Sequence, residues 1–377
     1  MSIDIFVLAI GPMKPGFFLL MMGIGLLFLG GVPAVLNFMD NQGFPYPLPI
    51  TFFQAHWFVM VYGFFLLLIG NELLVALSNE WRGNSAPTWL ILVFGVLVLL
   101  SNVLNELNNP LSYYLVIVAL VILMNYSRIY LSPSRIGLKP TAYNYLLFYT
   151  LLITSIIVSF QAVFDLPWLG LAFPALTIFA IMSRDLGLVL GGRRINQDEM
   201  VLAYISLAIG ILGYGMPLSP VFMVMGWGLS LHASGIPWSR GRPYPRIALT
   251  TAWIWLLVSA LVQENYDAYI HSLALGFLFN TVFGVDSVLI DMLVGITGKR
   301  LTVRPSYLPL ILLNLGLVMR VTFDLGLVSP ILLLSAPLQG IGIISFYALM
   351  FKQVIPQVRK VDKSESLIIK GERTARS

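Results

Sequence analysis

Apolar residues occur in long runs along this chain, and short polar or Pro/Gly-rich stretches separate the runs. Runs of about 20 apolar residues predict transmembrane helices, because a helix satisfies its backbone hydrogen bonds internally while it crosses lipid. The pattern gives twelve predicted spans, at residues 16–38, 52–78, 87–105, 111–127, 142–163, 167–183, 199–214, 218–234, 246–263, 268–294, 306–324 and 327–352.

The least regular part of the pattern is 199–234, which fits either one long kinked helix or two short helices. Its centre carries a cluster of helix-breaking residues, Gly213, Gly215, Pro217 and Pro220. Such residues end helices and form tight turns. The sequence therefore predicts a hairpin of two helices here.

Composition agrees with this membrane class. Of the 377 residues, 58% are hydrophobic and only 10% are charged, whereas an ordinary soluble protein has about 25% charged residues. This balance excludes a soluble enzyme with a wetted surface and a disordered chain. Cysteine is absent, which excludes disulfides, thiolate metal sites, iron–sulfur clusters and thiol catalysis. The predicted fold is an all-α bundle of about twelve transmembrane helices.

The lysines and arginines give this bundle an orientation. When the chain is divided into the twelve spans, 21 of its 22 cations fall on one side, including those that follow the even-numbered spans and those of the tail. The positive-inside rule then places both termini in the cytoplasm of a multi-pass cell-membrane protein. The net charge of +5 thus reflects membrane orientation and does not indicate nucleic-acid binding. We divide the chain into a transmembrane domain, 1–352, and a basic cytoplasmic tail, 353–377.

A few ionisable residues lie inside the predicted spans, where charge is costly and is a functional candidate by default. These residues are Arg320, Glu72, Asp286, Asp291, His56, His271 and His232. His56 and His271 each lie about one turn below the outer end of a descending span, so they share a depth. Glu72 and Asp286 follow them by 16 and 15 residues, which puts them about 24 and 22 Å deeper at 1.5 Å per residue.

The histidine pair has two interpretations. His56 and His271 are either ligands of a metal or haem, since imidazole is the usual axial ligand of a b-type haem, or interfacial polar residues bonded to neighbours. Arg320 could hold a haem propionate, and Asp324 follows it at i+4 as an ion-pair partner. His232 lies near the opposite face and fits the interfacial interpretation better.

The inner carboxyl groups also leave two interpretations open. Glu72, Asp286 and Asp291 either form a proton path from the cytoplasmic side or simply reach toward water at the membrane surface.

Two sequence stretches around the histidines resemble the NnrS family of membrane proteins. The first is "HWFVMVYGF" from His56, and the second is "HSLALGFLF" from His271, which leads into "GITGKRL". The family carries an H-x-H-E-M-x-F-G-F segment on an early helix and an H-A-L-x-x-G segment on a late helix before G-H-T-G-R. It also has twelve spans, so the architectural likeness covers the whole chain while the motifs cover only these stretches.

The resemblance implies a haem- and copper-containing protein linked to nitric oxide metabolism, with His56 and His271 as the matching cofactor ligands. This sequence departs from the family at Phe58, Val59 and Ile296, where the family has a second histidine, a glutamate and a third histidine. A copper site needs several imidazoles or sulfur ligands. Copper is therefore not expected, haem b is retained, and loss of both cofactors is left open.

Two functions from different classes follow. The first is a redox membrane protein that binds haem b near the outer face and serves respiratory electron transfer or nitric oxide handling. It could act with quinol, or as the hydrophobic subunit of a respiratory complex beside other subunits, within membrane lipid. The second is a transporter for a small solute or ion with no redox cofactor. The sequence does not decide whether the chain is an enzyme.

Overall fold

The computed structural model describes residues 15–41, 43, 56–164, 166–192, 194–296, 301–327 and 329–374. Within these ranges the chain is helical and contains no strand, which confirms the predicted all-α class. The main helical segments are α2 (Pro15–Asn41), α3 (His56–Phe58), η1 (Val59–Phe65), α4 (Leu66–Asn71), η2 (Glu72–Ala76), α5 (Leu77–Arg82), α6 (Thr88–Glu106), α7 (Leu111–Ser127), α8 (Ala142–Phe164), α9 (Ala172–Val189), α10 (Gln197–Leu212), α11 (Ser219–Ser234), α12 (Pro243–Leu261), α13 (Tyr266–His271), η6 (Ser272–Phe279), α14 (Asn280–Leu293), α15 (Tyr307–Asp324) and α16 (Ser335–Thr374).

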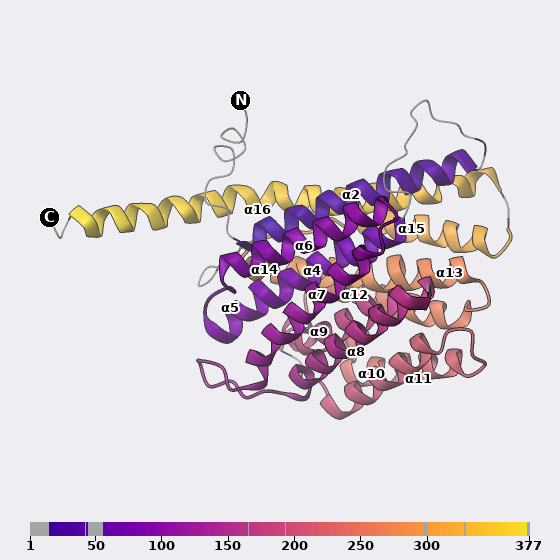
Figure 1. Cartoon of the computed structure of the whole chain (residues 1–377), viewed down its shortest axis with the longest axis horizontal. Helices are drawn as coiled ribbons and strands as arrows, with labels where there is room; N and C mark the ends of the chain where they lie inside the picture. The colour runs from indigo at the N-terminus through magenta and orange to yellow at the C-terminus, as the bar shows by residue number, and fades with distance from the viewer. Residues whose placement is uncertain are drawn as a thin grey trace.

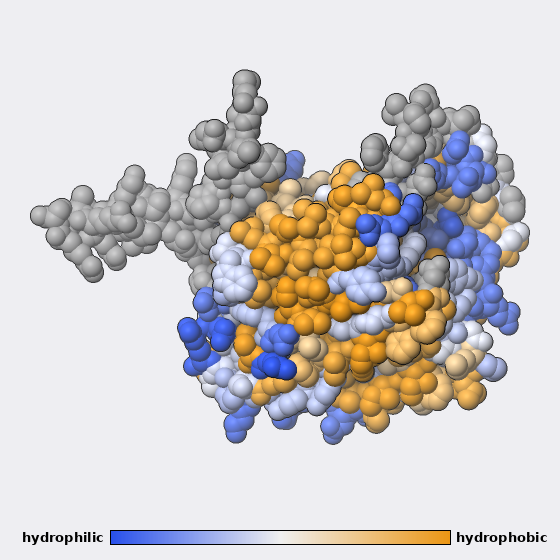
Figure 2. Space-filling model, in the orientation of Figure 1, coloured by the Kyte–Doolittle hydropathy of each residue, from blue (hydrophilic) through white to orange (hydrophobic). Residues whose placement is uncertain are grey.

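The helices lie side by side as a bundle, roughly along one direction (Figure 1). In the described part of the chain, ten helices are long and apolar enough to cross a membrane. Apolar residues cover much of the face shown in Figure 2, and hydrophilic residues gather toward the two ends of the helices. This distribution is typical of a helical membrane protein, whose lipid-facing surface is as apolar as its interior.

Helices α10 and α11 are the shortest pair, with 16 residues each. They pack closely because glycines let the backbones approach: a Cβ placed on Gly226 would lie 2.6 Å from Leu207 Cγ, and one on Gly210 would lie 2.5 Å from Met223 Cγ. The turn between them includes Gly215 at a φ of +81°, a left-handed conformation that suits glycine. The predicted hairpin within 199–234 is confirmed.

Three helical runs form the centre of the bundle. In the run from His56 to Arg82, 94% of the most apolar stretch is buried, and the value is 78% for Trp168–Val189 and for Tyr266–Leu293. The value is only 33% for Thr88–Glu106 and for Tyr307–Asp324, which lie at the periphery. The central runs carry both predicted outer histidines and the predicted inner carboxyl groups, so the fold places most of these candidates in its interior.

The central runs contain π-helical turns directly after both histidines. Segment η1 follows His56 by three residues, and η6 begins immediately after His271. The two segments meet through Phe64 and Phe279, whose rings stack with centroids 5.3 Å apart and an interplanar angle of 2°. π-Helical turns are rare in proteins, and those that occur are often at functional sites. The two turns therefore make this pair of helices a candidate functional region.

The last helix is longer than the pattern predicts. Helix α16 continues without a break from Ser335 to Thr374 and passes the predicted domain boundary at residue 352 (Figure 1). It extends past the end of the bundle at the side where α5 ends. The division into 1–352 and 353–377 stays a prediction.

Candidate functional site

His56 is anchored through one ring nitrogen. It is the first residue of α3, and its Nδ1 lies 2.9 Å from the carbonyl oxygen of Gly30 in α2. A carbonyl only accepts, so the Nδ1–H donates and the neutral ring keeps a lone pair on Nε2. No other residue in the described ranges hydrogen-bonds to Nε2. The imidazole is therefore oriented by the backbone with its second nitrogen left for another partner.

His271 has the same arrangement on a different helix. It ends α13, and its Nδ1 lies 2.7 Å from the carbonyl oxygen of Asp267 one turn earlier. The same nitrogen is 3.7 Å from Oδ2 of Asp324, and 22% of the side chain is exposed. A histidine whose Nδ1–H is held by a carbonyl or carboxylate is the common form of a metal-ligating imidazole.

Arg320 joins the two histidines at this end of the bundle. Its guanidinium interacts electrostatically with both imidazoles, and the imidazoles also interact with each other. The Arg320 Nε lies 2.9 Å from Oδ1 and 3.0 Å from Oδ2 of Asp324, which confirms the predicted ion pair. The guanidinium also lies 4.4 Å from the centre of the Phe38 ring. Arg320 therefore already has an anionic partner and an aromatic face.

The donor set of this cluster fits axial haem ligation better than a multi-ligand metal site. In the described ranges no group of three or more His, Asp or Glu residues is arranged to hold a metal ion. Two anchored imidazoles from different helices, which interact electrostatically with each other, match the needs of a b-type haem iron. A propionate would have to share Arg320 with Asp324. We call the cluster of His56, His271, Arg320 and Asp324 the histidine end.

His232 lies elsewhere. Its Nδ1 is 2.8 Å from Oε2 of Glu199, and 80% of its side chain is exposed. It occupies the last turn of α11, next to the start of α10. This exposed pair with a neighbouring side chain fits the interfacial interpretation of His232. An exposed pair of this kind contributes little to stability.

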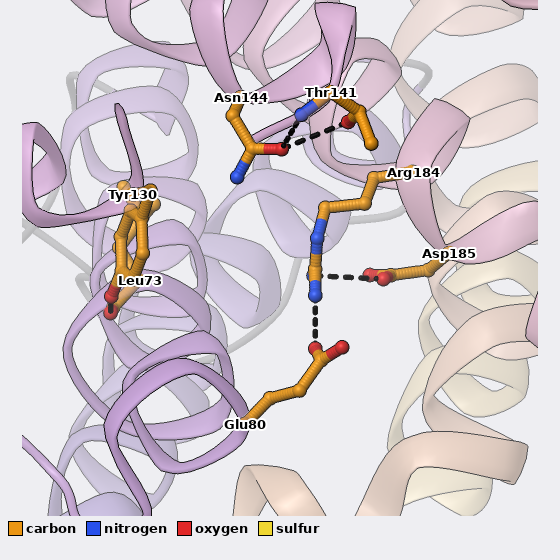
Figure 3. A network of polar contacts seen from close by, with 7 residues as sticks. All are labelled: Leu73, Glu80, Tyr130, Thr141, Asn144, Arg184 and Asp185. Carbon is orange, nitrogen blue, oxygen red and sulfur yellow. Dashed lines mark hydrogen bonds and ion pairs between the residues drawn. The ribbon is translucent and has the colours of Figure 1, made fainter. Parts of the chain in front are cut away.

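The opposite end of the central helices holds a charge network that the sequence analysis missed. The predicted span 167–183 leaves Arg184 in the following loop, but α9 continues to Val189 and places Arg184 inside the bundle. Its guanidinium bonds to Glu80 of α5 and lies 3.0 Å from Oδ1 of Asp185 (Figure 3). Only 13% of the Arg184 side chain and 3% of the Asp185 side chain are exposed. We call Glu80, Arg184 and Asp185 the arginine network.

A readable signal for this network was present in the sequence. Arg184 and Asp185 are adjacent, and the apolar run Leu186–Leu190 contains only one glycine after them. An opposite-charge pair followed by more apolar residues favours a helix that continues past the pair. The same observation corrects the prediction that 21 cations lie outside the spans, since Arg184 lies within one.

Glu72 lies close to this network, and Asp286 lies close to Glu72. Glu72 is half-buried at the start of η2 and interacts electrostatically with Arg184, Asp185 and Asp286. Asp286 is 5% exposed, and its Oδ2 has no hydrogen-bond partner within the described ranges. Asp291 is half-buried near the end of α14, and its Oδ1 accepts a hydrogen bond of 3.1 Å from its neighbour's backbone N–H. The structure thus brings Glu72 and Asp286 together.

Several residues used in the topology argument lie outside the described ranges. They are the cations Lys14, Arg193, Lys299, Arg300 and Arg376.

Comparison with known proteins gives one family and no function. A family model described as a domain of unknown function (DUF8744) matches residues 242–355, which is less than a third of the chain. The matched part includes His271, Asp286 and Arg320 but neither His56 nor Arg184. No curated protein and no solved structure matches the chain. The resemblance to the NnrS family stays a prediction.

Proposed function

We propose that this chain is an integral membrane redox protein in which His56 and His271 are the two axial ligands of a b-type haem. The observation that carries the proposal is the matched state of the two imidazoles. Each donates its Nδ1–H to a backbone carbonyl and keeps Nε2 for a further partner. Each is also followed by a π-helical turn, and these two turns contact each other.

The residues of the histidine end support this assignment through their chemistry. The carbonyls of Gly30 and Asp267 fix the orientation of the rings and make them more basic ligands. Arg320 and Asp324 form a neutral pair beside them, so the cationic side chain is held in place before any carboxylate is bound. A haem bound there supplies one-electron transfer, while the helices set its potential through burial and hydrogen bonding.

We further propose that the chain crosses the cell membrane twelve times with both termini in the cytoplasm. Helices α10 and α11 form an antiparallel pair, so they add either two crossings or none to the other ten. The number of crossings is even in both cases, and the two termini lie on the same side. The cations outside the helices support the orientation. In this topology the histidine end faces outward and the arginine network faces the cytoplasm.

Electron transfer at the outer face suggests two partner classes. A quinol in the membrane or another subunit of a respiratory complex would exchange electrons with the haem, in the surrounding lipid. Nitric oxide handling is the activity that the resemblance to the NnrS family implies. All of these partners and substrates require a bound haem, which a visible-region spectrum detects.

The test is a visible-region spectrum of the purified full-length protein, expressed with verified haem supply. We expect a reduced b-type α-band that is lost in His56→Ala and in His271→Ala. His232→Ala is the matched control, because His232 is exposed and lies away from the histidine end. A colourless wild-type protein, or a band that survives both ligand variants, would refute the proposal.

A small-solute or ion transporter without a redox cofactor is the second candidate. The observation that favours it is the buried charge at the arginine network, since charged residues inside a membrane often line substrate or ion paths. A colourless but folded protein that moves a solute into liposomes would favour this function.

A further inference from the structure

Among the buried and half-buried side chains described at the cytoplasmic side of the central helices, carboxyl groups outnumber cations in one cluster. Glu72, Glu80 and Asp185 all interact electrostatically with Arg184, and Asp286 interacts with Glu72. The groups come from three helical runs, 56–82, 168–189 and 266–293, which are the most buried of the bundle. Three carboxyl groups therefore share one guanidinium within this cluster of described residues, and a fourth, Asp286, interacts with one of the three.

Such an imbalance is unstable if every carboxyl group is ionised. Arg184 compensates Glu80 and Asp185 directly, through the contacts in Figure 3. Glu72 and Asp286 make no ion pair within the described ranges. A carboxylate left without a partner in a low-dielectric interior costs several kcal/mol, roughly, so such groups take up a proton instead.

A second unusual group, a buried tyrosine hydroxyl, interacts with Asp286. Tyr347 of α16 is 2% exposed, and its hydroxyl has no hydrogen-bond partner within the described ranges. The same hydroxyl interacts electrostatically with Asp286, whose Oδ2 is also unpartnered. Native proteins rarely leave buried polar atoms unpaired, and exceptions point to a function or to a bound partner. The Tyr347 hydroxyl is therefore the deepest group of a polar site that starts at Glu80 near the end of the bundle.

The order of these groups along the helices gives a direction. Glu80 lies two residues before the end of α5 and is 24% exposed, whereas Glu72 lies eight residues deeper in the same run. Eight residues correspond to about 12 Å of helix. Asp286 and Tyr347 follow on α14 and α16, and the Tyr347 ring contacts Phe64 of η1 edge to face at 6.2 Å between centroids. The groups thus run from the bundle end toward the π-helical contact at its centre.

We propose that Glu72 and Asp286 form a proton-binding pair that is loaded from the cytoplasmic end through Glu80, Arg184 and Asp185. In the loading step an aqueous hydronium gives its proton to a carboxylate of the arginine network, and the proton then passes to Glu72 and Asp286. Each transfer turns the accepting carboxylate into a carboxylic acid and returns the donor to its deprotonated form, which is water for hydronium and a carboxylate for each acid. Asp185 carries an Oδ2 beside Arg184 that has no hydrogen-bond partner among the described residues, which suits it to accept the proton.

A proton fits this site better than a metal cation. A metal ion needs several oxygen ligands that converge on one point, and no such group of three exists among the described residues. A proton needs only a succession of groups, which the three helical runs provide. Tyr130 adds a further polar group near Glu72 and Arg184, and its hydroxyl donates to the carbonyl of Leu73.

This inference does not depend on the haem. A proton-binding pair would serve a redox protein that takes up protons with electrons, and it would equally serve a proton-coupled transporter. Its failure and the failure of the haem proposal are therefore separate results, because one is read in the infrared and the other in the visible region.

The test is infrared spectroscopy of the full-length protein in lipid nanodiscs. At pH 7, where exposed carboxyl groups are ionised, we expect a carbonyl band of protonated carboxyl groups that shifts in heavy water. Glu72→Gln and Asp286→Asn should each remove part of this band and together remove at least half of it. Asp198→Asn is the matched control, since Asp198 is exposed in the first turn of α10, and it should leave the band unchanged.

A labelling experiment guards against variants that fold poorly. Dicyclohexylcarbodiimide adds the O–H of a protonated carboxyl group across one of its C=N bonds, and the adduct rearranges to a stable N-acylurea that keeps all atoms. Peptide mass spectrometry of the wild-type protein should find this adduct on Glu72 or Asp286. Wild-type protein with neither the adduct nor the infrared band, or a band that both variants retain, would overturn the proposal.

Discussion

Arg184 offers a direct measure of the energy held in the arginine network. Replacing it with methionine keeps the side-chain volume roughly constant but strands Glu80 and Asp185, whose side chains are only 24% and 3% exposed. Breaking a buried ion pair by removing one partner costs about 3–5 kcal/mol, because the remaining charge is left uncompensated. We expect a loss of this size in the free energy of unfolding of Arg184→Met.

Two further variants separate charge from shape. Arg184→Lys keeps the charge but loses the planar fork that reaches both carboxylates, so about 1.5–3 kcal/mol, the value of one charged hydrogen bond, should be lost. Combining Arg184→Met with Glu80→Gln and Asp185→Asn removes the stranded charges, and most of the stability should return. This recovery would not occur if the methionine simply packed badly.

The assay is equilibrium unfolding in mixed micelles, followed by the helical circular dichroism signal. Arg194→Met is the matched control, because Arg194 is exposed in the loop before α10, and it should change stability by no more than about 0.5 kcal/mol. A loss below about 1 kcal/mol in Arg184→Met would contradict the reasoning. It would place the three charges in water, as in a surface ion pair.

Three other outcomes follow from the structure. Gly226→Val should destabilise the α10–α11 pair by about 1–3 kcal/mol through overpacking against Leu207, whereas Gly228→Ala, with nothing within 4 Å of its Cβ position, should be neutral or slightly stabilising in the same unfolding assay. Asn314→Leu should cost about 1–3 kcal/mol in that assay, since Nε1 of Trp255 donates to the Asn314 side chain at 2.7 Å. Met216→Cys, in the α10–α11 turn and 66% exposed, should react with a membrane-impermeant maleimide from outside intact cells.

Each of these outcomes has its own control. The natural chain has no cysteine, so it is an unlabelled background, and Ser132→Cys at the other end of the bundle should react only after the cells are opened. Labelling of both positions from the same side would contradict the twelve-span topology. Equal stability of Gly226→Val and Gly228→Ala would show that α10 and α11 are not in close contact.

The sequence predicted most of the architecture, because lipid imposes a simple rule on the pattern. Apolar runs had to be helices, and clusters such as Gly213 to Pro220 had to end them. The ion pair of Arg320 and Asp324 was also predictable, since it depends only on i+4 spacing along one helix.

What the sequence did not predict depends on contacts between distant segments. The run Leu186–Leu190 indicates that the helix continues past Arg184, but it does not identify the partner Glu80, which is 104 residues away. The carbonyls that anchor His56 and His271 belong to the backbone, so these hydrogen bonds cannot be predicted from the types of the residues. The π-helical turns were equally hidden, because a uniformly apolar run fits several helical periods.

The 16-residue length of α10 and α11 has a consequence for the lipid around them. A helix of that length rises about 24 Å, which is shorter than the hydrocarbon core of about 30 Å in a typical bilayer. In the proposed twelve-span topology, lipid beside this pair must therefore be locally thin, while lipid beside the longer helices is not. The protein would carry a step in bilayer thickness around its perimeter, and short-chain lipids or a second protein with a matching short flank would gather at α10 and α11.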